Sequence, residues 1–161
     1  MQDTSAAPEA RPTQQSAVNR LLVAILRSPV HALASGSTAV LVYRGRRTGL
    51  TRELPVRYAQ ADGGYVVLVG RPEQKRWWRN FTTPWPLTVV ARGRAVAVEG
   101  TLVSGDSEEG LRLAGAYFAR FPGRLRRARR QTRRDALPST DQEILATAAH
   151  DLRFLRARRL R

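Results

Sequence analysis

The chain of 161 residues contains no cysteine. This absence excludes disulfides, thiolate nucleophiles, cysteine-bound zinc and iron–sulfur clusters. Histidine is almost as scarce, since His31 and His150 are the only two and lie far apart in the sequence. A histidine-rich metal centre or a Ser-His-Asp triad therefore has few candidate residues, and we expect no metal site.

Long hydrophobic runs are also missing. No stretch reaches the ~18 apolar residues of a transmembrane helix. The first fifteen residues are polar, include Pro8 and Pro12, and lack the apolar centre of a signal peptide. We therefore expect residues 1–15 to be a disordered tail, residues 16–161 to form one domain, and the protein to be cytoplasmic.

Acidic residues are few compared with basic ones. The chain has 28 Lys and Arg against 13 Asp and Glu, a net charge of +15, and Lys75 is the only lysine. Such a charge indicates an anionic partner, which could be a nucleic acid, a membrane surface or a polyanionic small molecule. The 42 % of hydrophobic residues is ordinary for a folded domain and argues against general disorder.

From Thr38 onward the chain is rich in β-branched and aromatic residues in short runs. Two glycine-containing turns, Asp62-Gly63-Gly64 and Arg92-Gly93, predict β-hairpins over residues 52–69 and 87–103. Strands are expected over residues 38–43, 52–59, 65–69, 87–91 and 94–103. Five short strands indicate a mainly β, α+β domain built on a small antiparallel barrel or sandwich, with its core at about 38–103 and helices on either side.

Helical patterns precede and follow the predicted strands. Ser16 is a plausible cap for an apolar helix over 17–28, which could pack on the barrel or lie on a membrane surface. Further helices are expected over 73–81, over 107–120 after Asp106 or Ser107, and over 140–149 with a capping box made by Ser139 and Gln142. Residues 151–161 fit either a last strand around 152–155 or a frayed basic tail.

An arginine run occupies the basic C-terminal region, about 104–161. Residues 120–134 hold eight arginines and no acid. Only Phe118 and Phe121 lie near the start of this run, and a nucleic-acid site would be expected to place aromatic side chains among its basic ones. We therefore favour a solvated basic helix, or one lying against the anionic inner face of a membrane, over nucleic-acid binding.

The most informative motif is Gly45-Arg46-Arg47-Thr48-Gly49-Leu50-Thr51-Arg52, between the first two predicted strands. Its two glycines allow backbone amides to approach a ligand. Thr48 adds a hydroxyl, and Arg46, Arg47 and Arg52 add guanidinium groups that suit phosphate or carboxylate. The loop is either an anion-binding cradle or a solvated turn in an arginine-rich protein.

A second cluster is Lys75-Arg76-Trp77-Trp78-Arg79-Asn80-Phe81. On a helix, Asn80 would share a face with Trp77, because residues three apart are neighbours. That face could stack on a planar heterocycle and bond to it through the amide. Alternatively, Trp77 belongs to the core and Asn80 caps the helix.

The order and spacing of these motifs, together with Pro55, resemble the deazaflavin-dependent nitroreductase and quinone reductase family of actinobacteria. The resemblance covers roughly residues 18–103 and includes Ser28-Pro29-Val30-His31 ahead of the first strand. It implies a split β-barrel related to FMN-binding oxidases. It also implies binding of coenzyme F420, a deazaflavin with a phosphate and an oligoglutamate tail, with FMN as the alternative cofactor.

The resemblance also implies roles for individual residues. The phosphate and tail would be held by Arg46, Arg47, Thr48, Gly49 and Arg52 from the loop and by Lys75 and Arg76 from the facing segment. Pro55 would lie against the deazaflavin, and Trp77 and Asn80 would form a wall of its groove. The implied reaction is hydride transfer from the reduced cofactor to a quinone or nitroaromatic acceptor. Tyr58 is the candidate catalytic hydroxyl at the acceptor, or else a packing residue.

Other functions stay open at this point. A split barrel can hold a deazaflavin, flavin or tetrapyrrole without turnover, and His31 could then ligate haem. Quinones partition into membranes, so a quinone reductase could contact the membrane surface peripherally. A homodimer is also possible, because related barrels are often dimeric.

Overall fold

The computed structural model describes residues 36–135 and 140–159. The predictions for the tail at 1–15, the helix at 17–28 and His31 lie outside the described residues, as does the predicted cap Ser139.

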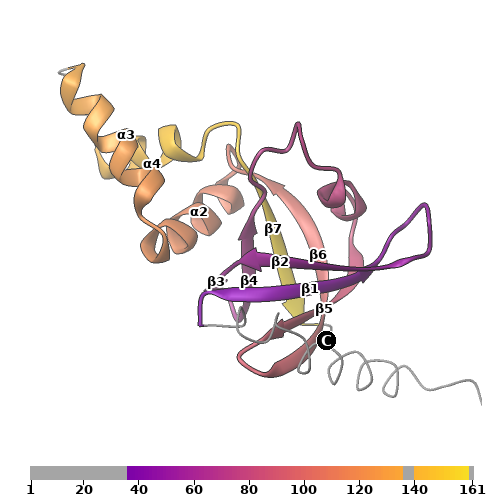
Figure 1. The fold of residues 1–161 in the computed structure, drawn as a ribbon. Helices are drawn as coiled ribbons and strands as arrows, with labels where there is room; N and C mark the ends of the chain where they lie inside the picture. The colour runs from indigo at the N-terminus through magenta and orange to yellow at the C-terminus, as the bar shows by residue number, and fades with distance from the viewer. Residues whose placement is uncertain (1–35, 136–139, 160–161) are drawn as a thin grey trace, which may run out of the picture.

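Seven strands form one sheet in which every neighbouring pair is antiparallel. Their order across the sheet is β2-β1-β5-β6-β7-β4-β3. The strands are β1 (Thr38–Arg44), β2 (Thr51–Arg57), β3 (Ala59–Ala61), β4 (Gly64–Leu68), β5 (Trp85–Ala91), β6 (Arg94–Ser104) and β7 (Arg153–Arg159). The edge strand β2 comes back into contact with β4, so the sheet curls into a split barrel (Figure 1). The predicted fold class is confirmed.

The predicted hairpin over 52–69 is wrong in its pairing. β2 pairs with β1, and β4 pairs with β3 and β7. The chain leaves β2 at Tyr58, whose backbone N–H donates to the carbonyl of Ser37 at 3.1 Å. A hairpin forms only between β3 and β4, where Asp62 and Gly63 both have positive φ, as a tight two-residue turn requires.

The C-terminal strand lies inside the sheet, between β6 and β4. The strand interpretation of residues 152–155 is thus confirmed, and the barrel extends beyond the expected 38–103. Apolar side chains on both faces of β7 explain why this strand lies inside the sheet. Phe154 packs with the cluster under the helices, whereas Leu155 packs inside the barrel, because successive side chains of a strand point to opposite faces.

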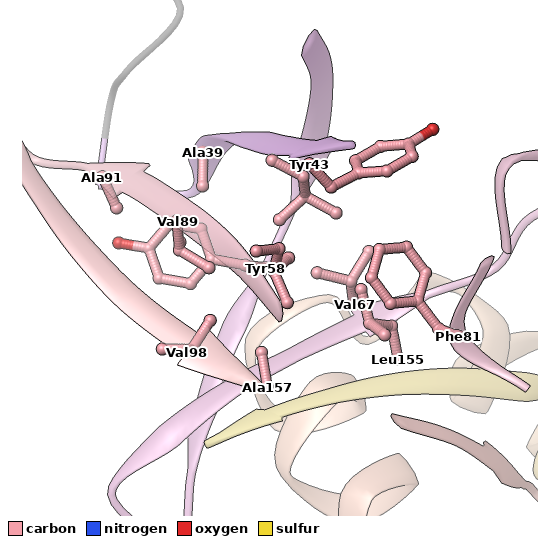
Figure 2. Close-up of a cluster of buried hydrophobic side chains, with 12 residues drawn as sticks. Ala39, Tyr43, Tyr58, Val67, Phe81, Val89, Ala91, Val98, Leu155 and Ala157 are labelled. Atoms are coloured by element: carbon pink, nitrogen blue, oxygen red, sulfur yellow. The ribbon is translucent and has the colours of Figure 1, made fainter. Parts of the chain in front are cut away.

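The described residues form three apolar clusters, and the two larger ones use the two faces of the sheet. The third is small and consists of Val40, Val42 and Val90, with Ala95 packed against them. The cluster inside the barrel includes Leu41, Tyr58, Val67, Phe81 and Leu155 (Figure 2). The other large cluster lies between the sheet and the helices and includes Leu113, Phe118 and Phe154.

Of the three α-helices in the described residues, α2 (Glu108–Arg120) packs on this second face, whereas α3 (Gly123–Arg134) and α4 (Asp141–Ala149) pack against α2 and against each other (Figure 1). Ser107 caps α2, as expected, and accepts the N–H of Gly110 at 2.9 Å. The capping box of α4 is shifted by one residue from the prediction. Thr140 and Glu143 form it, with the Thr140 N–H donating to Glu143 Oε2 at 2.7 Å.

The helix predicted over 73–81 is mostly absent. Only the short 3-10 helix η2 (Trp77–Phe81) forms, and the preceding residues make turns. Arg71 has a φ of +52°, and the indole N–H of Trp78 donates to the carbonyl of Pro72 at 3.0 Å. These two features turn the chain back at a point where a longer helix would have run straight.

A candidate anion-binding cavity at the β1–β2 turn

Residues 45–50 of the motif form the turn between β1 and β2, and Thr51 and Arg52 begin β2. The Gly45 N–H donates to the Leu50 carbonyl at 2.9 Å, and the Gly49 N–H donates to the Gly45 carbonyl at 2.8 Å. Gly49 has a φ of +64°, and a Cβ on Gly45 would lie 2.8 Å from Thr48 Oγ1. Both glycines are therefore needed for the shape of the turn.

Arg46 ties this turn to the segment that contains η2. Its Nε donates to the carbonyl of Asn80 at 2.7 Å. Its Nη2 donates to the carbonyls of Thr83 and Pro84 at 2.9 and 3.0 Å. The guanidinium also lies over the ring of Trp85, 4.1 Å from its centroid. Most of the hydrogen-bonding capacity of Arg46 is thus used within the protein.

Asn80 completes the same connection with its side-chain amide. Its Oδ1 accepts the backbone N–H of Arg46 at 2.9 Å, and its Nδ2 donates to the carbonyl of Trp77 at 2.8 Å. Asn80 therefore fixes the turn relative to η2, so the two motifs found in the sequence become one structural unit.

A cavity of about 450 Å³ opens between the turn and η2. Five arginines and no acidic residue line it. The lining residues are Tyr43, Gly45, Arg46, Arg47, Thr48, Arg52, Arg76, Trp77, Arg79 and Asn80. Such a basic, partly enclosed surface suits an anionic ligand, because the potential of several nearby cations adds up.

The structure thus brings together seven of the predicted site residues, namely Arg46, Arg47, Thr48, Arg52, Arg76, Trp77 and Asn80. Gly49, Pro55 and Lys75 are not among the lining residues. Tyr58 is also elsewhere: it is 2 % exposed and borders two hollows near the start of β1.

Sequence reasoning assigned no site role to three lining residues, Tyr43, Gly45 and Arg79. The ring of Tyr43 packs edge-on to Phe81 with 5.2 Å between centroids. Burial raises the pKa of the Tyr43 hydroxyl, and the nearby Arg52 lowers it by a smaller amount. The signal for Tyr43 was its period-two spacing after Ala39 and Leu41, which places all three on the barrel's inner face.

A curled antiparallel sheet with a basic cavity at one end defines a split-β-barrel protein. The family model described as F420H(2)-dependent quinone reductase matches residues 19–138, and the chain belongs to that family. The family's description is that of an F420-dependent oxidoreductase.

One solved structure with a similar fold is HutZ, a heme storage protein from Vibrio cholerae. It is 15 % identical, with a TM-score of 0.51, and the match covers 84 % of this chain and 91 % of HutZ. At this identity the likeness shows the split-barrel fold. No curated protein matches the chain. Among residues 36–135 and 140–159, no helix is both long and apolar enough to cross a membrane.

Proposed function

We propose that this protein binds coenzyme F420 in the cavity at the β1–β2 turn and transfers a hydride from the reduced cofactor to a quinone or nitroaromatic acceptor. The family supports F420 as the cofactor. The single observation that carries the proposal is the convergence of five arginines, without an acid, on one cavity.

The side chains present fit the charge of F420, whose phosphate and glutamate carboxylates are all anions. Arg47, Arg52 and Arg76 make no salt bridge or side-chain hydrogen bond to any residue that the structure describes. Nothing in the described part of the chain therefore occupies their donors, which can bond to a ligand. Forked guanidinium groups bind phosphate and carboxylate oxygens through paired, charge-assisted hydrogen bonds.

Arg46 and Asn80 take a different role in this proposal. Because their polar atoms already bond to the protein, they position the turn and η2 against each other. The ring of Trp77 forms an apolar wall beside them. This arrangement holds Arg47 and Thr48 in place before the ligand arrives, which lowers the entropic cost of binding.

When bound, reduced F420 supplies a hydride, that is, two electrons and one proton, and a quinone must take up one further proton to become the quinol. Tyr43 lines this cavity, and its phenol is protonated at neutral pH, as a tyrosine with the ordinary pKa of about 10 already is. It can donate a hydrogen bond to an anionic oxygen of the ligand. The contacts of Gly49, Pro55 and Lys75 with the cofactor, and of Tyr58 with the acceptor, remain predictions.

The test mixes the full chain with reduced F420 and menadione and follows the return of the oxidised-deazaflavin absorbance. We expect turnover, and we expect Arg47→Ala and Arg52→Ala to need more cofactor, whereas Arg133→Ala on α3 should behave as the native protein. Binding without reoxidation would instead support a storage or carrier function. If the protein binds FMN tightly and does not bind F420, then FMN is the cofactor.

A further inference from the structure

We infer that the protein has a second anion-binding site, at the end of the barrel opposite the β1–β2 turn, for a small organic molecule that carries a carboxylate or a phosphate. This site does not depend on the proposed function. It is formed by two adjoining hollows of about 340 and 450 Å³. Tyr58, Gln60 and Arg92 border both of them.

The two ends of the barrel are well separated. The backbone of Tyr58 bonds to Ser37, just before β1, whereas the first cavity lies beyond the other end of β1. Seven strand residues at ~3.3 Å each span roughly 23 Å. Figure 2 shows the hydroxyls of Tyr43 and Tyr58 on opposite sides of the same apolar cluster.

The charge around the second site is also one-sided. Arg92 borders both hollows, Arg120 borders one, and Arg94 and Arg159 border the other, with no acidic residue in either lining. None of these four arginines forms a salt bridge within the described part of the chain. Arg120 donates one hydrogen bond from Nη2 to the carbonyl of Gly36 and keeps its other N–H groups. The guanidinium groups of Arg92 and Arg120 both come to 3.7 Å from the point that a Cβ on Gly36 would occupy. Neighbouring cations without a counter-charge raise the local potential and favour an anion.

Tyr58 supplies the independent observation that points to a ligand. The residue is 98 % buried, being 2 % exposed, yet it borders both hollows. Its hydroxyl points toward the side of the interior cluster where Ala91 lies, opposite the hydroxyl of Tyr43 (Figure 2). Within the described residues this hydroxyl has no hydrogen-bond partner. A nearly buried hydroxyl that opens onto a basic hollow is placed to donate to an anionic oxygen.

The rest of the lining suggests what accompanies the anionic group. Val96, Ala91 and the ring of Tyr65 border the larger hollow, and Tyr65 lies edge-on to Tyr58 with 5.6 Å between ring centroids. Val96, Ala91 and Tyr65 give the hollow an apolar, aromatic side, beside the polar side formed by Gln60 and the arginines, so a ligand with both a flat organic part and an anionic group fits it. The anionic group would then meet Arg92, Arg120 and the Tyr58 hydroxyl.

Two variants isolate this site without damaging the fold. Arg92 has a φ of +50° in the turn between β5 and β6, followed by Gly93 at +71°. Asparagine adopts that conformation more readily than arginine does, so Arg92→Asn removes the guanidinium and keeps the turn. Tyr58→Phe removes only the hydroxyl. Arg133→Asn removes the same charge from α3 and is the matched control.

The experiment titrates the full chain with benzoate and with inorganic phosphate by calorimetry. We expect at least one probe to bind, Arg92→Asn and Tyr58→Phe each to weaken it by about tenfold, and Arg133→Asn to change it by less than about twofold. The Tyr58 resonance of protein labelled with 13C-tyrosine, assigned from Tyr58→Phe, should shift on binding. Binding of phosphate alone identifies a phosphate ligand, and binding of benzoate alone identifies a ring carboxylate.

Three results would overturn the inference. The first is that neither probe binds. The second is that binding persists unchanged in both Arg92→Asn and Tyr58→Phe. The third is that Arg47→Ala abolishes binding while Arg92→Asn does not, because the probe would then occupy the cavity at the β1–β2 turn.

Discussion

Individual side chains near the β1–β2 turn divide into those that build the cavity and those that face it. Arg46 and Asn80 spend their polar atoms on backbone groups. Arg47 and Arg52 line the same cavity and form no such bonds with residues 36–135 and 140–159. Mutants of Arg47 and Arg52 should therefore lose affinity for the ligand, whereas mutants of Arg46 and Asn80 should lose structure.

Removal of one unpaired guanidinium should weaken the cofactor and spare the fold. We expect Arg47→Ala to reduce the affinity for F420 by about 1.5–3 kcal/mol, as for one charge-assisted contact. Calorimetric titration measures it, and Arg133→Ala serves as the control with equal loss of charge. An unchanged affinity would remove Arg47 from the site.

Replacing Asn80 should mainly lower the stability of the fold, whereas replacing Arg47 should mainly lower the affinity for the cofactor. Asn80→Ala deletes the bonds to the Arg46 N–H and the Trp77 carbonyl, and we expect it to lower the free energy of unfolding by about 1–2 kcal/mol. Urea denaturation checks this. Asn80→Asp keeps the acceptor for Arg46, so it should lose less stability than alanine does. Full stability of Asn80→Ala would contradict the bracing role.

At the scale of elements, helix α2 is held close to the end of β6. A Cβ on Gly110 would lie 1.8 Å from the Ser104 carbonyl oxygen, a contact that only glycine avoids. On the same helix, a Cβ on Gly115 would meet nothing closer than 3.8 Å. Gly110 and Gly115 therefore lie on the same helix, but only Gly110 has no room for a side chain, so Gly115 serves as its control.

Alanine substitution should have opposite effects at these two positions. Gly110→Ala must push α2 away from β6, and we expect it to cost about 3 kcal/mol, the upper end for overpacking. Gly115→Ala should stabilise by up to about 1 kcal/mol through helix propensity. Thermal unfolding of both variants tests the pair, and equal behaviour would show that the close approach at Ser104 is not required.

His150 joins the end of α4 to the start of α2. Its Nδ1 lies 2.9 Å from Asp106 and its Nε2 lies 3.2 Å from Asp151. The hydrogen bond to Asp106, followed by the charge of Asp151, raises the pKa of His150 above its usual 6.5. The folded state thus binds the proton more tightly than the unfolded chain does.

The raised pKa of His150 determines the direction in which the stability of the fold changes with pH. The stabilisation is complete below the His150 pKa of the unfolded chain and is lost as pH rises through the higher pKa of the folded state. We therefore expect the urea concentration at the midpoint of unfolding to decrease as the pH is raised from about 5 to about 9. His150→Gln should flatten this part of the profile, and a profile that rises there would contradict the assignment.

At the scale of the whole molecule, the positive charge is spread over several surfaces. α3 has no buried residue; Arg129 pairs with Asp141 at 2.9 Å, and Arg124 bonds to the carbonyl of Ala148 at 3.1 Å. Leu125 and Ala128 pack toward the second apolar cluster. The helix carries no aromatic residue, which base stacking would need, so we keep the proposal of an anionic membrane surface over that of nucleic acid.

The α3 surface leads to a binding prediction. The protein should sediment with phosphatidylglycerol vesicles but not with phosphatidylcholine vesicles, and ~0.5 M salt should release it, because each arginine near an anionic surface contributes about 1 kcal/mol. Replacing Arg126, Arg127 and Arg130 with glutamine should abolish sedimentation. If the protein instead binds single-stranded DNA at physiological salt and does not bind vesicles, the partner of α3 is a nucleic acid.

The possible homodimer is a separate question, which sedimentation equilibrium of the same protein answers.

The sequence by itself determined the local features of this protein. The Asp62-Gly63 and Arg92-Gly93 turns and Gly49 follow from a positive φ that few residues adopt readily, and the cap at Ser107 follows from a side-chain oxygen that accepts a helix N–H, so the local residue order was enough to find them. The two motifs of the cavity were found for the same reason and through the family resemblance. The hairpin predicted over 87–103 is confirmed by the pairing of β5 with β6. The tertiary structure alone decided how the other strands pair, where β7 enters the sheet, and which cations face a cavity. Long-range pairing depends on how the whole sheet curls and buries its two faces, and no local pattern carries that information. For that reason Tyr43 lines the first cavity, while Tyr58 lies at the far end of the barrel.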